Sequence, residues 1–326
     1  MFLSRSPLRI SLAGGGTDLP SYYKLHKGLI ITAAINKYIY VSVNKTWKNN
    51  FFLKYSKIEI TKSISSIKHN AIREVLKMFN IENYLEISSI SDVPAGTGLG
   101  SSGTFLVGLI NAIKSSQYKN LSRKELADLA CKIEMEVLKQ PSGKQDPYIS
   151  SFGGLKVMNI NNSGKTIIED LKISLDFRDQ LENSFVAFFT GYTRMSKNIL
   201  NEQEKKTKSR NKEMINNLNF VKDIASETIN IFKKESLDDY AKIMNEHWIH
   251  KMKRSKDMST AKINNLIEIG LKNGAMGAKL IGAGGGGFIL FIAKDKIRLK
   301  KKMKELNLQE LKFGFDYDGS VIMSRN

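Results

Sequence analysis

Strand-like and helix-like runs of apolar residues alternate along the first half of the chain. Strands are predicted over residues 8–13, 29–35, 39–44, 51–55, 84–90 and 153–160. Helices are predicted over residues 68–79 and 99–115, and a capping box of Ser122 and Glu125 opens a third helix that extends to about residue 138. This half therefore contains both kinds of element.

The pattern changes near residues 161–183, where a turn is followed by mainly polar residues. Beyond it we predict a buried strand over 184–190, a long charged helix over 198–234, more helix to about 253, and a helix over 260–272. Residues 279–293 are expected to form two apolar strands around a glycine turn, followed by a helix over 296–306 and strands near 312–315 and 320–324. We therefore divide the chain into two domains, residues 1–180 and 181–326.

Composition limits where the protein works. The chain has 326 residues, and no run approaches the ~20 apolar residues that cross a bilayer. Its first residues do not resemble a signal peptide, and Cys131 is the single cysteine, so an intrachain disulfide is impossible. We predict a cytoplasmic protein without a membrane partner, in which Cys131 is a buried structural thiol.

The charge balance is strongly basic, with 51 Lys and Arg against 32 Asp and Glu and a net charge of +19. Nucleic-acid binding is the obvious alternative function for such a chain. The lysines are spread along the whole sequence, however, and neither a zinc-finger spacing nor an RNA-binding signature is present. We interpret the charge as a solvated lysine-rich surface that attracts anionic metabolites, and we expect no nucleic-acid partner.

One segment has the composition of an anion-binding loop. It is Pro94-Ala-Gly-Thr-Gly-Leu-Gly-Ser-Ser-Gly103, between a predicted strand and a predicted helix. Glycines allow close backbone approach to an anion, and unpaired N–H groups at a helix start point toward it. The spacing is neither a Walker A motif nor a dinucleotide fingerprint. The loop is therefore a candidate polyphosphate site, and an ordinary tight turn is the alternative.

A phosphate-transferring site also needs a cation and oxygen ligands to hold it. Ser102 at the helix start and Glu134 on the following helix are candidate Mg²⁺ ligands. Glu136 is about 200° away from Glu134 around a helix, so at most one of these two carboxylates faces the site. A surface salt bridge is the alternative role for either glutamate.

Two aspartates and one arginine complete the candidate chemistry. Asp146 precedes Pro147 in a turn-rich segment, where it either caps a helix or accepts a proton from a hydroxyl nucleophile. Arg9 is the candidate cation that keeps this carboxylate ionised. Asp18, in Gly14-Gly-Gly-Thr-Asp18, either binds sugar hydroxyls or forms a local turn.

Taken together, these segments resemble the GHMP kinases, a family that includes galactokinase, homoserine kinase and mevalonate kinase. The family shows three motifs in order. Their counterparts here are Pro7-Leu-Arg-Ile-Ser-Leu-Ala-Gly-Gly-Gly-Thr-Asp18, the loop at 94–103, and Lys279-Leu-Ile-Gly-Ala-Gly-Gly-Gly-Gly-Phe288. The resemblance extends from residue 5 to about residue 325.

The resemblance implies a fold, a cofactor set and residue roles. The implied fold is α+β in two domains, with a left-handed βαβ unit in the first. ATP would lie on Pro94, Ala95, Gly96, Thr97, Gly98, Leu99, Gly100, Ser101, Ser102 and Gly103, and Mg²⁺ on Ser102 and Glu134. Asp146 would be the catalytic base and Arg9 would stabilise its anion. Thr17 and Asp18 would bind the sugar, and Gly284 and Gly285 of the third motif would contact the substrate with their backbone.

The amino-acid sequences of two segments indicate a branch of this family. Gly14-Gly-Gly-Thr-Asp-Leu-Pro20 and Gly143-Lys-Gln-Asp146 resemble kinases that phosphorylate sugars at the anomeric hydroxyl, namely heptose 7-phosphate kinases and fucokinase domains. The length of the chain and the lack of a fused second enzyme favour the heptose 7-phosphate kinases over the fucokinase domains. Such an acceptor needs a second anion site, for which Arg194 is the candidate and a surface arginine the alternative. A fucokinase, another free-sugar 1-kinase and a non-catalytic sugar sensor remain alternatives, and a homodimer is compatible with all of them.

Overall fold

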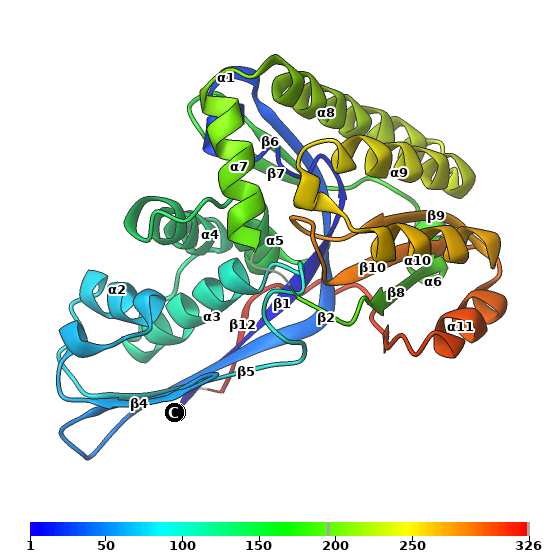
Figure 1. The fold of residues 1–326 in the computed structure, drawn as a ribbon. Helices are drawn as coiled ribbons and strands as arrows, with labels where there is room; N and C mark the ends of the chain where they lie inside the picture. The colour runs from blue at the N-terminus through cyan, green and yellow to red at the C-terminus, as the bar shows by residue number, and fades with distance from the viewer. Residues whose placement is uncertain (194–195, 325–326) are drawn as a thin grey trace.

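A computed structural model describes residues 1–193 and 196–324, which fold around two β-sheets (Figure 1). The strands of the first sheet run in the order β12-β1-β2-β5-β3-β4, with β6 on the other part of β2 and β7 beyond β6. Their bounds are β1 Phe2–Ala13, β2 Gly28–Lys45, β3 Phe51–Lys54, β4 Ile58–Thr61, β5 Leu85–Ser91, β6 Leu155–Ile160, β7 Thr166–Asp170 and β12 Val321–Ser324.

Strand β2 is a single strand of 18 residues, where the sequence predicts two. Its pairing with β1 shifts register opposite Pro7 and Leu8, between Ile35 and Tyr38. Such a bulge accommodates extra residues without ending the strand. The two halves of β2 then pair with different strands, residues 28–33 with β6 and residues 39–45 with β5.

The second sheet has the order β11-β8-β10-β9. Its strands are β8 Phe185–Phe189, β9 Ala275–Leu280, β10 Phe288–Ala293 and β11 Glu310–Leu311. Strands β9 and β10 pair antiparallel around the glycine turn, which confirms the predicted pair of apolar strands at 279–293. Helices α9 and α10 pack against β9.

The helices are α1 Pro20–His26, α2 Asn70–Met78, α3 Ser101–Ser116, α4 Arg123–Lys132, α5 Gln145–Phe152, α6 Leu175–Ser184, α7 Ser196–Lys208, α8 Lys212–Lys233, α9 Leu237–Met252, α10 Ala261–Lys272 and α11 Lys296–Glu305. The predicted single helix over 198–234 is wrong in one respect, because it is interrupted between α7 and α8. Arg210 has a φ of 56°, and the Asn211 side chain accepts a hydrogen bond from the Met214 amide and caps α8. None of the described helices is long and apolar enough to cross a membrane.

Strands β3 and β5 form the parallel pair of the first sheet, and α2 lies in the connection between them. This is the βαβ unit that the resemblance places in the first domain. The left hand of its crossover stays a prediction. Helices α3 and α5 contact β1, β2 and each other. Gly103, near the start of α3, lies against Asp146 in the first turn of α5.

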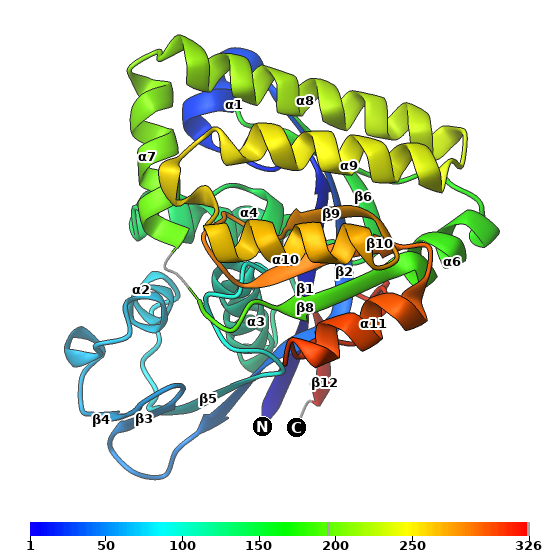
Figure 2. The same cartoon turned by 45° about the vertical axis from the view of Figure 1, so that its right-hand side comes forward.

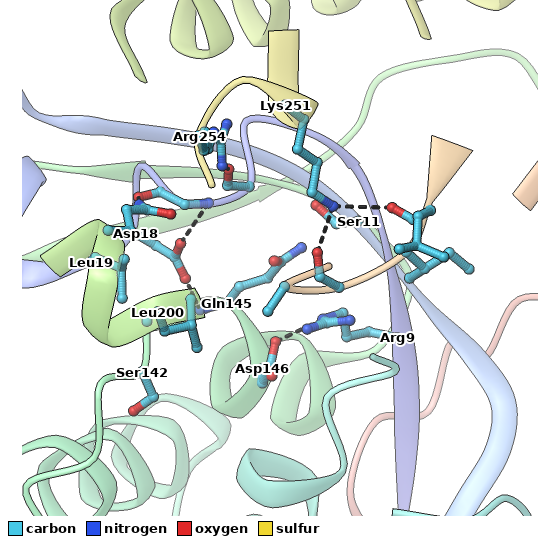
Figure 3. Close-up of a pocket in the computed structure, with 18 of the residues that line it drawn as sticks. Arg9, Ser11, Asp18, Leu19, Ser142, Gln145, Asp146, Leu200, Lys251 and Arg254 are labelled. Atoms are coloured by element: carbon cyan, nitrogen blue, oxygen red, sulfur yellow. Dashed lines mark hydrogen bonds and ion pairs between the residues drawn. The ribbon is translucent and has the colours of Figure 1, made fainter. Parts of the chain in front are cut away.

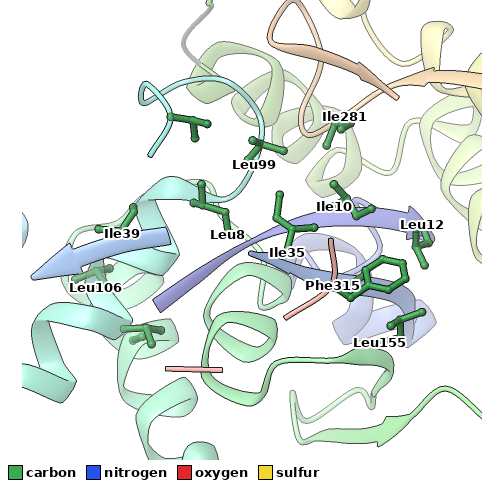
Figure 4. Close-up of a cluster of buried hydrophobic side chains, with 14 of the residues drawn as sticks. Leu8, Ile10, Leu12, Ile35, Ile39, Leu99, Leu106, Leu155, Ile281 and Phe315 are labelled. Carbon is green, nitrogen blue, oxygen red and sulfur yellow. The ribbon is translucent and has the colours of Figure 1, made fainter. Parts of the chain in front are cut away.

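One apolar core joins the two parts of the chain. In Figure 4, Leu8 and Ile10 of β1 lie close to Leu99, before α3, and to Ile281, after β9, and all four side chains are buried. All described strands of the second sheet follow residue 180. Strand β12 nevertheless returns to pair with β1, and Figure 2 shows the two strands side by side. The end of the predicted second domain thus belongs to the first sheet.

Candidate active site

The glycine loop at 94–103 is exposed at its start and buried where it meets the core. Gly96, Gly98 and Gly100 have φ values of 76°, 83° and 84°, which glycine adopts without strain. Residues 94–96 are exposed, whereas Leu99 is buried in the core and anchors the loop. Helix α3 begins at Ser101, and no side chain caps its amino end. The loop and the helix start therefore provide an open site with backbone N–H donors for an anion.

The second and third glycine motifs pack backbone against backbone. A Cβ atom on Gly98 would lie 2.7 Å from the Ile281 carbonyl oxygen, and one on Gly282 would lie 2.5 Å from the Gly98 Cα. A Cβ on Gly287 would lie 2.2 Å from the Thr97 carbonyl oxygen. These positions admit only glycine at this separation. The glycines of the third motif thus hold the β9–β10 turn against the loop.

Asp146 and Arg9 form an ion pair directly below the loop. The Arg9 Nε donates to Asp146 Oδ1 at 2.7 Å, and the two side chains are 8% and 26% exposed. The Arg9 Nη1 also donates to the Gly98 carbonyl. Asp146 lies in the first turn of α5, where its carboxylate is paired with Arg9. A Cβ on Gly100 would lie 3.0 Å from the Asp146 Cγ, so this carboxylate is next to the loop.

Gly103 allows α3 and α5 to approach each other. A Cβ at this position would lie 2.8 Å from the Asp146 Cβ and 2.9 Å from the Pro147 Cδ. An alanine here would therefore push against the residue that faces the site.

Glu134 lies in a π-helical turn, Ile133–Val137, that continues α4. Its side chain is buried, and burial raises the pKa of its carboxyl to about 7, with a further rise from the negative charge of Asp146. The Ser102 side chain acts in the opposite direction on this pKa. Glu136 is exposed, as expected if only one of the two carboxylates faces the site.

The Glu134 carboxylate has a free oxygen. Its Oε2 is buried and accepts no hydrogen bond within the part of the chain that the structure describes. A buried oxygen of this kind needs a donor or a cation. Over residues 1–193 and 196–324, no group of three or more His, Cys, Asp or Glu side chains could hold a metal. A cation at Glu134 would therefore take its other oxygens from Ser102, water and the phosphates of a ligand.

A pocket opens on the side of Asp146 away from the loop (Figure 3). Asp18 lines it and is buried. Its Oδ2 accepts the Gln145 amide at 3.0 Å and its Oδ1 accepts the Gly16 amide at 3.2 Å. Burial raises the pKa of Asp18, and the charge of Asp146 raises it further. Asp18 therefore accepts a nearby backbone amide, as the local-turn interpretation predicts, and it also lines the pocket. Its role in binding a sugar hydroxyl stays a prediction.

Three other predicted substrate contacts are placed differently. Thr17 is fully buried, and its hydroxyl contacts the backbone of Gly14 and Leu29, so it pins the first glycine motif to β2 and does not line the pocket. Gly284 and Gly285 pack on Met258, and the turn reaches the pocket with Gly282 and Ala283 instead. Arg194 lies outside the described residues.

Sequence reasoning missed a group of basic side chains in this pocket. His247, Lys251 and Arg254 come from the end of α9 and the residues after it, and Lys279 comes from β9. All four are buried. His247 and Lys251 are spaced i and i+4, which places them on one face of α9, and Arg254 follows in the turn after the helix. The same face carries the buried Met244. Basic residues at helix positions where core residues are expected are therefore the sequence feature that could have indicated this group.

Comparison with known proteins is consistent across sequence and structure. The family descriptions "GHMP kinases N terminal domain" and "GHMP kinases C terminal" match residues 65–154 and 229–309. The chain is 30% identical over 337 residues, 97% of each chain, to D-glycero-alpha-D-manno-heptose 7-phosphate kinase of Campylobacter jejuni. It is 24% identical to an L-fucokinase/L-fucose-1-P guanylyltransferase of Bacteroides fragilis, over 92% of this chain and 36% of that protein. A solved D-glycero-D-manno-heptose 1-phosphate kinase of Bacteroides thetaiotaomicron has a TM-score of 0.82 and 27% identity over 100% of both chains.

Proposed function

This chain belongs to the GHMP kinase family, and we propose that it transfers the γ-phosphoryl group of ATP to the anomeric hydroxyl of D-glycero-D-manno-heptose 7-phosphate, giving the 1,7-bisphosphate. The observation that carries this proposal is the position of Asp146. Its carboxylate contacts the glycine loop on one side and lines the pocket on the other. A phosphoryl donor on the loop and an acceptor in the pocket would thus meet at this side chain.

The residues around Asp146 support direct transfer. Asp146 would accept the proton of the attacking hydroxyl as that oxygen bonds to phosphorus. Arg9 holds the Asp146 carboxylate through its Nε and fixes its orientation. The N–H groups of the loop would stabilise the charge that develops on the phosphoryl oxygens. Transfer would release ADP and leave the phosphate on the former hydroxyl oxygen.

The site fits a magnesium ion. Glu134 and Ser102 would hold it, because the unpartnered Glu134 Oε2 is an oxygen ligand of the kind that Mg²⁺ prefers. When bound, Mg²⁺ neutralises charge on the β- and γ-phosphates of ATP.

The similar proteins support a heptose phosphate as acceptor. The Campylobacter jejuni relative is named as a heptose 7-phosphate kinase and the Bacteroides thetaiotaomicron structure as a heptose 1-phosphate kinase, so both names contain a heptose and a phosphate. The relative with a fucokinase name is less similar, and this chain spans 36% of its length. Because ATP is the proposed donor, we propose that the protein acts in the cytoplasm. A homodimer is the assembly that we propose to test, by light scattering.

A coupled ADP-release assay with Mg-ATP tests this function. Four acceptors are compared in parallel: D-glycero-D-manno-heptose 7-phosphate, L-fucose, galactose and mevalonate. We expect turnover with the heptose phosphate alone, and phosphorus NMR of the product should show a new phosphate on C1. Turnover with L-fucose would replace the proposed acceptor by a free sugar. Absence of turnover with all four, while ATP still binds, would favour the sugar sensor.

A further inference from the structure

We propose that Arg254 and Lys251 bind the phosphate group that the acceptor already carries. This inference rests on the proposed function, because it concerns the acceptor of the same reaction, and it assigns the second anion site that such an acceptor needs. It also changes the candidate for this role, which the sequence places at Arg194.

The first observation is a buried positive charge without an anionic partner. Arg254 is 4% exposed and Lys251 is 8% exposed. Neither forms a salt bridge with a carboxylate of residues 1–193 or 196–324. The charge of Asp18 acts on Arg254, but Asp18 already accepts two backbone amides. Buried charges are normally paired, so an anion from outside the chain is expected.

The direction of the pKa shifts agrees with this reading. Burial lowers the pKa of Lys251 well below its usual value, and the neighbouring Arg254 and Lys279 lower it further. Burial likewise lowers the pKa of Arg254, to about 10. A bound phosphate would oppose both shifts, because an opposite charge favours the protonated form.

The second observation is the set of hydrogen-bond donors that the protein leaves free. Arg254 donates from Nε to Asn217 Oδ1 at 2.8 Å and from Nη1 to the Gly15 carbonyl at 2.9 Å. Its Nη2 is buried and donates to no acceptor in the described parts of the chain. Lys251 donates to the Leu280 and Gly282 carbonyls at 3.0 and 2.6 Å, which leaves one of its three donors.

A purely structural role explains only part of this arrangement. The two bonds of Lys251 hold the β9–β10 turn, and the two bonds of Arg254 tie the first glycine motif to α8. The Asn217 amide is itself fixed by the His250 carbonyl at 2.6 Å. The guanidinium plane is therefore held in place while its Nη2 edge has no partner. A planar fork of this kind matches the oxygens of a phosphate.

The third observation separates this anion site from that of the nucleotide. No residue of the loop at 94–103 lines the pocket that contains Lys251 and Arg254. In Figure 3, Arg254 and Lys251 lie on one side of the pocket and the Asp146–Arg9 pair on the other, with Asp18 between them. An acceptor with its reacting hydroxyl at Asp146 would extend past Asp18 and place a distal phosphate at Arg254.

The test compares Arg254→Gln with wild type on two acceptors, D-glycero-D-manno-heptose 7-phosphate and the same heptose without phosphate. We expect wild type to prefer the phosphorylated sugar, and the ratio of the two kcat/KM values to fall ~100-fold in Arg254→Gln, since each lost bond to a charged group weakens binding by about 10-fold or more. Arg254→Lys should fall between the two. Lys253→Gln is the matched control, because Lys253 is an exposed cation next to Arg254 that does not line this pocket.

Several results would overturn the assignment. Equal loss on both acceptors would mean that Arg254 only holds the fold together. A weaker affinity for ATP in Arg254→Gln would assign the cations to the nucleotide. Equal use of both sugars by wild type would remove the need for a second anion site, and this arm does not depend on whether the variant folds.

A binding measurement separates this inference from the proposed reaction. If wild type turns over no sugar, the proposed function fails. Titration calorimetry with heptose 7-phosphate, without ATP, still decides the phosphate site. Binding by wild type and its loss in Arg254→Gln would keep the site, whereas equal binding by both proteins would reject it.

Discussion

The two anion sites that we propose for this protein are built in opposite ways. The loop at 94–103 is exposed at its start and offers backbone N–H groups, and it contains no charged side chain. The pocket behind Asp146 offers buried charged side chains, among them Lys251 and Arg254, and the Arg254 Nη2 has no acceptor among the residues that the structure describes. The first site requires glycines in left-handed conformations, and the second requires cations removed from water.

This difference explains what each site can select. A site made of backbone N–H groups binds the polyphosphate of the nucleotide, which is the same whatever the acceptor is. It does not distinguish one acceptor from another. A buried cation without a partner is destabilising until an anion arrives, so it favours an acceptor that carries a phosphate over one that does not. Nucleotide binding and acceptor choice can thus be changed separately.

The largest expected effect comes from removing Asp146, which lies between the two sites. We expect Asp146→Asn to lower kcat by about 10³-fold or more, because the variant lacks the proton acceptor, while both ligands still bind. ADP-release kinetics and calorimetry with ATP check the two halves of this prediction. Asp170→Asn is the control, since Asp170 is paired with Lys156 and does not line the pocket. Full activity of Asp146→Asn would reject the role of this carboxylate.

The next effect concerns Glu134 and its raised pKa. A carboxyl whose pKa is higher in the folded than in the unfolded protein destabilises the fold as pH rises from its ordinary pKa through about 7. At pH 8 without Mg²⁺, the free energy of unfolding of Glu134→Gln should therefore exceed that of wild type by on the order of 3 kcal/mol, and the variant should unfold at a higher temperature. Below the ordinary pKa of a glutamate the two proteins should differ little.

Magnesium should reverse the order of the melting temperatures of wild type and Glu134→Gln at pH 8. Added Mg²⁺ is expected to stabilise wild type at pH 8 and leave Glu134→Gln unchanged, since metal binding requires the ionised carboxylate. Melting curves at the two pH values, with and without Mg²⁺, provide the measurement. Glu136→Gln is the control, because Glu136 is exposed on the same turn. A wild-type melting temperature that does not respond to Mg²⁺ would contradict the ligand assignment.

The smallest effect sharpens the comparison at the backbone site. Gly98→Ala introduces a Cβ that would lie 2.7 Å from the Ile281 carbonyl oxygen, at a φ of 83°. We expect the KM for ATP to rise ~10-fold, from about 1–3 kcal/mol of strain in the loop, with the acceptor KM unchanged. Gly191→Ala matches it, because Gly191 has a φ of 90° and open space around it. An equal response in the two variants would mean that a strained residue weakens ATP binding through a general loss of stability, and not through the contact of the loop with Ile281.

Much of the fold followed from sequence where the signal was local. The hairpin at 279–293 and the helix after the glycine loop were predicted because their apolar runs are long and clearly bounded. The short elements α1, β4 and β7, and the helix α6, were missed, since short segments give too few repeats of a periodic pattern to be told from a loop. Helix α5 was considered only as the alternative role of Asp146, as a helix cap. The single strand β2 was predicted as two, because a bulge is a property of pairing with β1 and not of the strand alone.

The residues of the candidate site also fall into those that local sequence predicted and those that only the tertiary structure identified. The sequence by itself was enough to predict the residues for phosphoryl transfer, namely the glycine loop, Asp146 and Glu134. It also identified the family, because the three motifs are local in the chain. The tertiary structure alone decided that Thr17 is a buried strut and that Arg254 lies in the pocket, 239 positions after the Gly15 carbonyl that it contacts. Whether a cation lies in solvent or in a pocket without a counter-charge depends on contacts between distant segments, and no local pattern contains them.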